Sequence, residues 1–110
     1  MPGLSIHVVD VSRGVVATGM KIEVFFQNRK IIDGIASAKG IVEEPRALEP
    51  GAYEALFHVA EWYRKQKLAL PEVPFLDVVT FRFGIADPRQ HYHLPFKCTP
   101  WGYSCFRGGA

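Results

Sequence analysis

Most of this chain consists of short runs in which apolar and polar residues alternate, separated by residues that favour turns. In the first run, residues 4–9, three apolar side chains share one face: Leu4, Ile6 and Val8. A period of two residues is that of a β-strand with one face in a core, so His7 is expected on the opposite face. Further runs rich in β-branched and aromatic residues predict strands at 20–26, 30–35, 52–59, 75–85, 90–97 and 103–106.

Two segments depart from the strand pattern. Residues 60–67 favour a helix and end before Pro71, which predicts a helix of about two turns that must pack on a sheet. Residues 43–51 contain two prolines and a glycine, which predicts a loop. The pattern as a whole predicts an all-β fold, a β-sandwich of seven to eight strands with one short helix, as a single domain over residues 1–110.

Composition argues against several classes of partner. With a net charge of +2 and scattered basic residues, the chain lacks the charge excess typical of proteins that bind nucleic acids or membrane surfaces. It has no apolar run near the roughly 20 residues of a membrane span, and its N-terminus does not resemble a secretory signal. We therefore expect no nucleic-acid partner, no membrane partner, a cytoplasmic location, and free thiols at Cys98 and Cys105.

Two histidines on alternate residues, His91 and His93, are the first candidates for chemistry. In a strand they share one face, where paired imidazoles can act as a base, a proton shuttle or part of a metal site. They can equally be two half-exposed surface histidines. With His7 they would make a set of three imidazoles that suits zinc, and Cys98 is an alternative candidate as a thiol nucleophile.

Three segments together resemble one protein family. Residues 4–10, Leu-Ser-Ile-His-Val-Val-Asp, resemble its N-terminal signature, and residues 91–95, His-Tyr-His-Leu-Pro, resemble its H-Y-H-V/L-P signature. Residues 104–109, Ser-Cys-Phe-Arg-Gly-Gly, resemble its C-terminal S-T-Y-R-G-S. Over nearly its whole length the chain is similar to the 5-hydroxyisourate hydrolases, the enzymes to which transthyretin is related.

The resemblance implies a transthyretin-like β-sandwich that assembles as a homotetramer, a dimer of dimers, with active sites in a channel where the dimers meet. It implies no cofactor and no metal, and a small purine-derived substrate whose cyclic amide is opened by water. Carried over by position, His7 and His93 match the two family histidines that are catalytic. Arg107 and Gly108 match the terminal motif, which binds substrate.

Three positions depart from the family pattern. The D-G-R turn of the family reads Lys-Gly-Ile here, so Ile41 stands where the family has an arginine. Phe106 replaces the terminal tyrosine and Gly109 the terminal serine, with Ala110 added. The loop after Gly40 is a few residues shorter than in the family, which makes Arg46 a candidate substitute for the missing arginine. Cys98, where the family usually has leucine, is a further candidate for the lining of the site.

All three departures remove hydrogen-bonding groups while both histidines remain. An isourate whose ring nitrogens carry methyl groups has fewer donors and more apolar surface, and burial of each methyl is worth about 0.8 kcal/mol. Such compounds would arise from oxidation of methylxanthines such as caffeine. We therefore expect a hydrolase of N-methylated 5-hydroxyisourate. The alternatives are an ordinary 5-hydroxyisourate hydrolase of urate degradation, or a non-catalytic binding protein on the same fold.

Overall fold

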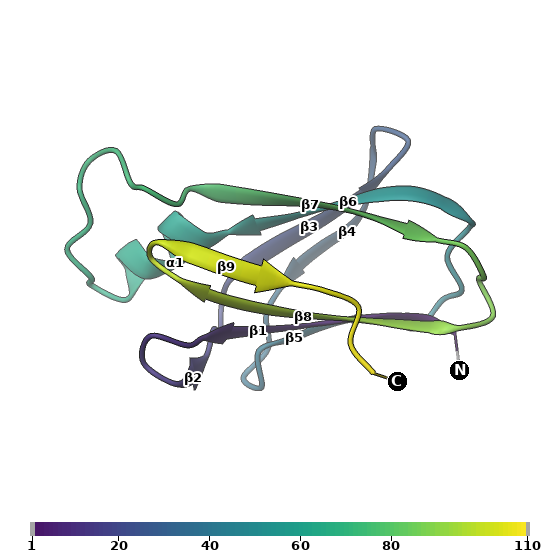
Figure 1. Ribbon diagram of the computed structural model, residues 1–110, viewed down its shortest axis with the longest axis horizontal. Helices are drawn as coiled ribbons and strands as arrows, with labels where there is room; N and C mark the ends of the chain where they lie inside the picture. The colour runs from purple at the N-terminus through teal and green to yellow at the C-terminus, as the bar shows by residue number, and fades with distance from the viewer. Residues whose placement is uncertain (1, 110) are drawn as a thin grey trace.

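The computed structural model describes residues 2–109, so Met1 and Ala110, the added last residue, lie outside the described part. The described residues form two facing sheets, with one helix at one end of the sandwich (Figure 1). In chain order the elements are β1 (Gly3–Asp10), β2 (Val15–Val16), β3 (Lys21–Phe26), β4 (Arg29–Ile35), β5 (Ile41–Glu44), β6 (Gly51–His58), α1 (Val59–Lys65), β7 (Val78–Ile85), β8 (His91–Thr99) and β9 (Gly102–Cys105).

The first sheet is built around β1 and β8, which run parallel. Its order is β2-β1-β8-β9, and β5 also pairs with β1, on the side away from β8. The parallel register aligns Ser5 with His93 and His7 with Pro95, while antiparallel β5 places Ile41 opposite His7. This register brings the N-terminal and H-Y-H-L-P segments side by side although they lie over 80 residues apart in the sequence.

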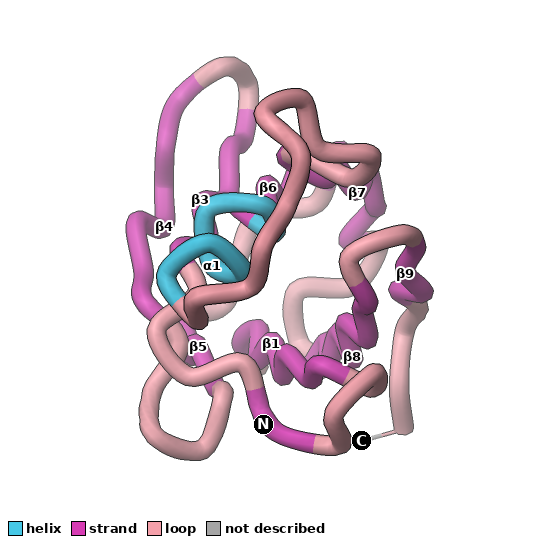
Figure 2. The backbone as a smooth tube through the Cα atoms, turned by 90° about the vertical axis from the view of Figure 1, so that its left-hand side faces the viewer, coloured by secondary structure: helices cyan, strands magenta, loops and turns pink. Residues whose placement is uncertain are grey.

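The second sheet is antiparallel throughout, with the order β4-β3-β6-β7. Strands β7 and β9 form edges of the two sheets on the same side of the sandwich (Figure 2). Neither edge has a further strand beside it within residues 2–109. An unpaired edge exposes backbone N–H and C=O groups that can pair with another chain.

The core lies between the sheets and follows the alternation read from the sequence. Leu4, Ile6 and Val8 are buried, as predicted, and residues 53, 55 and 57 of β6 are buried opposite them. Phe57 and Phe96 connect the two layers, with ring centroids 3.9 Å apart. The transthyretin-like β-sandwich with one short helix is thus confirmed, with nine strands in the described residues instead of seven to eight.

The helix is shorter than predicted, and two hydrogen bonds from aromatic side chains on its buried face hold it in place. The Tyr63 hydroxyl donates to Asp10 Oδ1 at 2.7 Å, and the Trp62 indole donates to the Thr18 carbonyl oxygen at 2.7 Å. Burial alone would raise the pKa of Asp10, but hydrogen bonds from Ser12, Arg13 and Tyr63 outweigh it and lower that pKa. The helix therefore docks on the end of β1 through an ionised, fully satisfied carboxylate.

Two short strands were not predicted. β2 is only two residues long, and β5 extends into the first two residues of the segment 43–51 that was predicted to be a loop. Strand β5 exists because it pairs with β1 over four residues, a partner choice that its own sequence does not reveal. Conversely, residues 75–77 were predicted as strand, but β7 begins only at Val78, after a loop that contains two prolines.

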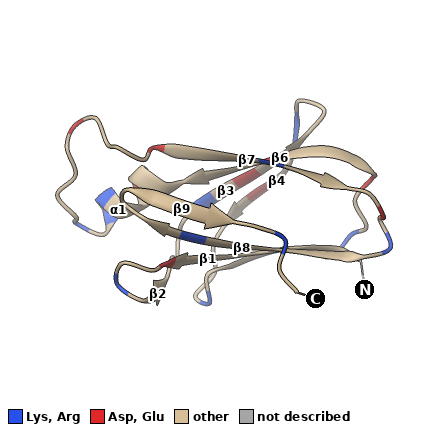
Figure 3. Ribbon diagram, viewed as in Figure 1, with Lys and Arg blue, Asp and Glu red and all other residues tan. Residues whose placement is uncertain are grey.

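Charges are dispersed over the surface of this fold. Figure 3 shows the positions of basic and acidic residues interspersed along the ribbon, on strands and loops, in keeping with the net charge of +2. Among residues 2–109, no helix is long and apolar enough to cross a membrane.

Candidate active site

The two family-matched histidines lie on one face of the first sheet, the face turned away from the core. On β1 and β8 the side chains alternate between buried and half-buried, and His7 and His93 belong to the half-buried set. They project from adjacent parallel strands and are diagonal neighbours, because His93 is level with Ser5 and His7 with Pro95. The structure thus brings together the two residues that the sequence placed 86 positions apart.

Ser5 connects the histidines of β8 and was not singled out from the sequence. Its Oγ lies 2.7 Å from His93 Nδ1 and 2.8 Å from His91 Nε2. His91 Nδ1 in turn lies 3.3 Å from the carbonyl oxygen of Pro2. The only signal for Ser5 in the sequence is its position two residues before His7, and its role appears only once the parallel register of β1 and β8 is known.

The surroundings of His93 favour its neutral form. Burial lowers its pKa, and the nearby imidazoles of His7 and His91 lower it further, while the contact with Ser5 acts in the opposite direction. An ordinary histidine titrates near 6.5, so His93 stays neutral to lower pH than an exposed histidine does. A neutral imidazole with a free ring nitrogen can act as a general base near neutral pH.

The residue beside His7 on the other side is Ile41. It lies on β5, is half-buried, and pairs with His7 in the antiparallel register, so both side chains share the outer face. Glu43 is the next residue of β5 on this outer face, and it pairs with Ser5. Ile41, a predicted substrate-binding residue, therefore lies directly beside the candidate catalytic residue His7.

The C-terminal segment lies against His93. The Gly108 amide donates to the His93 carbonyl oxygen at 2.7 Å. A Cβ at position 108 would lie 2.9 Å from Pro95 Cγ and 3.0 Å from His93 Cδ2, so only glycine fits without a shift. A Cβ at Gly109 would meet nothing within 4 Å, so the position where the family has serine is open here.

Phe106 and Arg107 have different surroundings. Phe106 is 46% exposed, and Lys97 Nζ lies over its ring, 5.8 Å from the centroid. The Arg107 guanidinium stacks on Tyr92, 4.0 Å from the ring centroid, and donates to Gln90 Oε1 and the His91 carbonyl oxygen. Tyr92 faces the core, so in the single chain Arg107 anchors the C-terminal segment against β8.

Arg46, the candidate substitute for the missing arginine, is paired with a glutamate in the single chain. Its guanidinium and its backbone amide both bind the Glu44 carboxylate at 3.0 Å. Glu44 is level with Leu4, a core-facing residue, so this pair lies on the opposite face of β5 from Ile41. Arg46 instead lines a separate surface hollow with residues that include Arg29 and Tyr53. Arg46 follows the end of β5 and is held by Glu44, so in the single chain its guanidinium does not lie beside His7 or His93.

Cys98 is also not part of the outer face. It is fully buried, with its Sγ 3.7 Å from the Tyr63 hydroxyl, and burial raises its pKa to about 11. A buried, protonated thiol on the core side neither lines the site nor acts as a nucleophile at neutral pH. Both Cys98 and Cys105 are free thiols. For the zinc alternative, no three histidine, cysteine or acidic side chains within residues 2–109 are placed to hold one metal ion.

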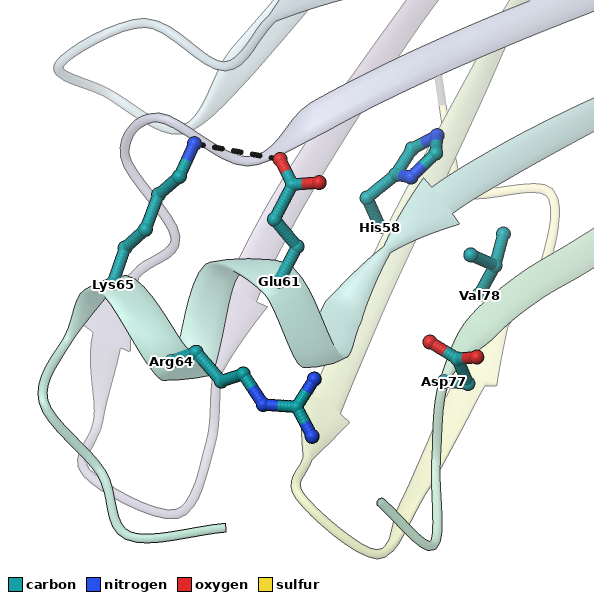
Figure 4. Close-up of a pocket in the computed structure, with 6 residues that line it drawn as sticks. All are labelled: His58, Glu61, Arg64, Lys65, Asp77 and Val78. Atoms are coloured by element: carbon teal, nitrogen blue, oxygen red, sulfur yellow. Dashed lines mark hydrogen bonds and ion pairs between the residues drawn. The ribbon is translucent and has the colours of Figure 1, made fainter. Parts of the chain in front are cut away.

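A second hollow lies between the helix and the start of β7. Figure 4 shows the side chains around it: His58, Glu61, Arg64, Lys65, Asp77 and Val78. His58 is bound to Glu23 at 2.6 Å, Lys65 to Glu61 at 3.4 Å, and Arg64 to two carbonyl oxygens. Because these basic groups are already engaged within the chain, the outer face with His7 and His93 remains the better candidate for an active site.

Comparison with known proteins agrees with the motifs. The family model described as the HIUase/Transthyretin family matches residues 4–108. The chain belongs to this family. Among curated relatives, the 5-hydroxyisourate hydrolase of Deinococcus radiodurans is 37% identical, with 97% of this chain and 96% of the relative covered. That of Ralstonia nicotianae is 38% identical, with 98% and 99% covered.

Solved structures of the HIUase/transthyretin family share the same fold. A Klebsiella pneumoniae 5-hydroxyisourate hydrolase superposes with a TM-score of 0.86 at 24% identity, covering 99% of this chain and all of the other. Sea bream transthyretin gives a TM-score of 0.80 at 20% identity, with 97% and 95% covered. At these identities the superpositions show the fold, which is shared by an enzyme and a hormone-binding protein, so function must be argued from the site.

Proposed function

We propose that this chain is a hydrolase that opens the cyclic amide of a 5-hydroxyisourate, and that its substrate carries N-methyl groups. The observation that carries the proposal is the placement of His7 and His93 on one outward face, with the C-terminal segment against them. The reaction class is supported by the relatives at 37–38% identity, which are 5-hydroxyisourate hydrolases. The methylated substrate is supported by the side chains around the two histidines.

Opening a cyclic amide requires removal of a proton from water and donation of one to the leaving nitrogen. In the proposed reaction His93, which is held neutral, accepts the proton as the water oxygen attacks the ring carbonyl carbon. His7 lies diagonally across the strand pair, within reach of the same small bicyclic ring. It would hold the carbonyl oxygen or the ring nitrogen while the C–N bond breaks.

The proposed preference for methyl groups rests on three positions. Ile41 presents an aliphatic side chain directly beside His7, Phe106 presents an exposed ring, and Gly109 leaves open space. An unmethylated ring N–H buried against Ile41 would lose its hydrogen bonds to water, at a cost of about 1–3 kcal/mol. A methyl group at the same place would gain about 0.8 kcal/mol from burial.

The site is open to one side in the single chain, which supports the homotetramer as part of the proposal. The face that carries the histidines is only half-buried, and edge strands β7 and β9 are both unpaired within residues 2–109. Pairing of these edges between two copies, and contact of the outer faces between two such dimers, would enclose the histidines. Sedimentation equilibrium would give the mass of four chains, whereas a monomer would contradict this assembly.

The experiment is a turnover assay in which 5-hydroxyisourate or its trimethyl analogue is produced in situ by an oxidase. The decay of its absorbance is followed with and without the protein. If the proposal is right, the trimethyl analogue decays faster with the protein present than without it. The ordinary 5-hydroxyisourate hydrolase, which the relatives' names favour, predicts acceleration of the unmethylated compound alone. Acceleration of neither compound would leave the non-catalytic binding protein.

A further inference from the structure

The contacts behind His93 form a continuous row of polar atoms. His93 Nδ1 lies 2.7 Å from Ser5 Oγ, Ser5 Oγ lies 2.8 Å from His91 Nε2, and His91 Nδ1 lies 3.3 Å from the Pro2 carbonyl oxygen. The row crosses from β8 to β1, back to β8 and then to the residue before β1. The parallel register produces it, because Ser5 and His93 are level and His91 lies two residues earlier on the same face.

The end of the row fixes the position of every proton in it. A carbonyl oxygen only accepts, so His91 carries its proton on Nδ1 and presents a lone pair at Nε2. Ser5 has one hydroxyl proton, which it donates to that lone pair. The remaining contact then requires His93 to donate from Nδ1 to Ser5 Oγ. Neutral His93 is left with its lone pair on Nε2, the nitrogen turned away from the row.

We propose that Ser5 and His91 are positioning residues for His93: they hold it in the tautomer with a free Nε2, and they receive the positive charge formed when Nε2 takes a proton. This inference rests on the proposed hydrolase function for the charge transfer. The tautomer itself is a property of the resting protein and is independent of the substrate.

The proton movements balance along the row. When the oxygen of water bonds to the ring carbonyl carbon, its proton goes to His93 Nε2 and the carbonyl π pair moves to the carbonyl oxygen. The Nδ1 proton of His93 moves to Ser5 Oγ, and the hydroxyl proton of Ser5 moves to His91 Nε2. His93 and Ser5 are neutral again, and His91 is an imidazolium. The reverse shift returns a proton through His93 Nε2 to the ring nitrogen as the C–N bond breaks.

The surroundings of His93 disfavour a positive charge on its own ring. Burial and the imidazole of His7 oppose charge on His93. His91 lines a surface hollow together with Glu43, which lies on the same outer face of β5 and whose carboxylate attracts an imidazolium. Glu44 also borders this hollow, but its carboxylate is paired with Arg46. The titratable and charged groups that face this row or its ends are His7 from β1, Glu43 from β5, Lys97 from β8, and Arg107 from the C-terminal segment.

The first test measures the His93 tautomer directly by 15N NMR of labelled histidine in the full chain. The wild type is expected to show protonated Nδ1 and unprotonated Nε2 on His93. Ser5→Thr keeps a hydroxyl and should keep this signature, whereas Ser5→Ala should give a mixture of tautomers. Ser104→Ala is the matched control, an exposed serine on the same sheet. A wild-type His93 protonated at Nε2, or an unchanged tautomer in Ser5→Ala, would overturn the inference.

The second test uses the pH dependence of kcat/KM, whose acid limb reports the base of the free enzyme. In the wild type one proton is shared between His93 and His91, so the midpoint belongs to the pair. His91→Gln removes the site that receives the charge, so the acid limb should move to lower pH. Ser5→Ala should lower kcat/KM about 10–100-fold, as loss of a partner that orients a working imidazole does elsewhere.

The two proposals fail in different ways. If the acid limb of His91→Gln is unmoved or moves to higher pH while the wild type is active, His91 receives no charge and the inference is wrong. If the wild type turns over neither substrate, the proposed function is wrong, and the NMR measurement still decides whether Ser5 and His91 set the His93 tautomer. Retention of the tautomer and of activity in Ser5→Thr separates the hydroxyl's role from a general effect on packing.

Discussion

His7 and His93 carry the proposed reaction, and they are held differently. His93 is bonded to Ser5, level with it on the neighbouring strand, while His7 stands between Ile41 and Pro95 in the same sheet. Pro95 has no amide hydrogen and Ile41 no polar side-chain atom, so the immediate neighbours of His7 offer it no side-chain hydrogen bond. His7 is therefore free to bind a polar atom of the substrate.

Replacement of either histidine should remove most of the activity. His7→Ala and His93→Ala should each lower kcat by about 10²–10⁴-fold, the usual contribution of a positioned acid or base. Cys105→Ala, at a free thiol whose pKa burial raises to about 12, is the control and should be near the wild-type rate. Retention of activity in His93→Ala would mean that another group is the base.

Ile41 is the residue expected to set substrate preference. Ile41→Arg would place a cationic donor beside His7, where it can bind a ring carbonyl or an unmethylated edge. The ratio of kcat/KM for the unmethylated over the trimethyl compound should rise about 10–100-fold, which corresponds to about 1–3 kcal/mol. Gly109→Ser can be added to restore the serine hydroxyl that the family has at this position, since a Cβ there meets nothing within 4 Å. An unchanged ratio in both variants would show that these positions do not discriminate between methylated and unmethylated substrates.

Among the elements, the C-terminal segment depends on one glycine. Gly108→Ala would place a methyl group 2.9 Å from Pro95 Cγ and displace the segment from His93, so kcat/KM should fall at least several-fold. Gly102→Ala, at the first residue of β9, meets nothing within 4 Å and serves as the matched control. Equal activity of the two variants would argue that the segment does not form part of the site.

The second sheet contains a charged cluster that should make stability depend on pH. The Lys30 ammonium first, and then His58, lower the pKa of Glu23 to about 2. Because the folded pKa lies below the ordinary value near 4.3, this stabilisation is complete above that value and is lost as pH falls toward 2. Glu23→Gln should cost about 1–3 kcal/mol at pH 7, measured by urea unfolding. The deficit relative to wild type should shrink between pH 5 and about 2, and a constant deficit would contradict the assignment.

At the scale of the whole molecule, the layered architecture follows from the sequence, but the assembly of the site does so only in part. Alternation placed Leu4, Ile6 and Val8 inside and His7 outside, and the structure agrees. The motifs identified His7 and His93, because their spacing matches a known family. These are properties of single strands, which local patterning specifies.

What the sequence did not yield depends on contacts between strands. Ser5 was missed because its role requires the parallel register of β1 and β8, which no local pattern encodes. Arg46 was predicted to reach the site because the loop after Gly40 is short, but after the end of β5 it pairs with Glu44. Cys98 was a candidate by its position in the family pattern, and the alternation of β8 turns it toward the core. Arg107 matched the terminal motif, and in the single chain it stacks on Tyr92.

Our central proposal is that this chain is a hydrolase that prefers methylated rings, because its site has both histidines but lacks three polar groups of the family pattern. The most direct test is the ratio of kcat/KM for trimethyl-5-hydroxyisourate over 5-hydroxyisourate, measured on the wild-type protein under identical conditions. We predict acceleration of the methylated compound and a ratio above one. A ratio well below one would contradict the retuned site, and acceleration of neither compound would contradict the enzyme itself.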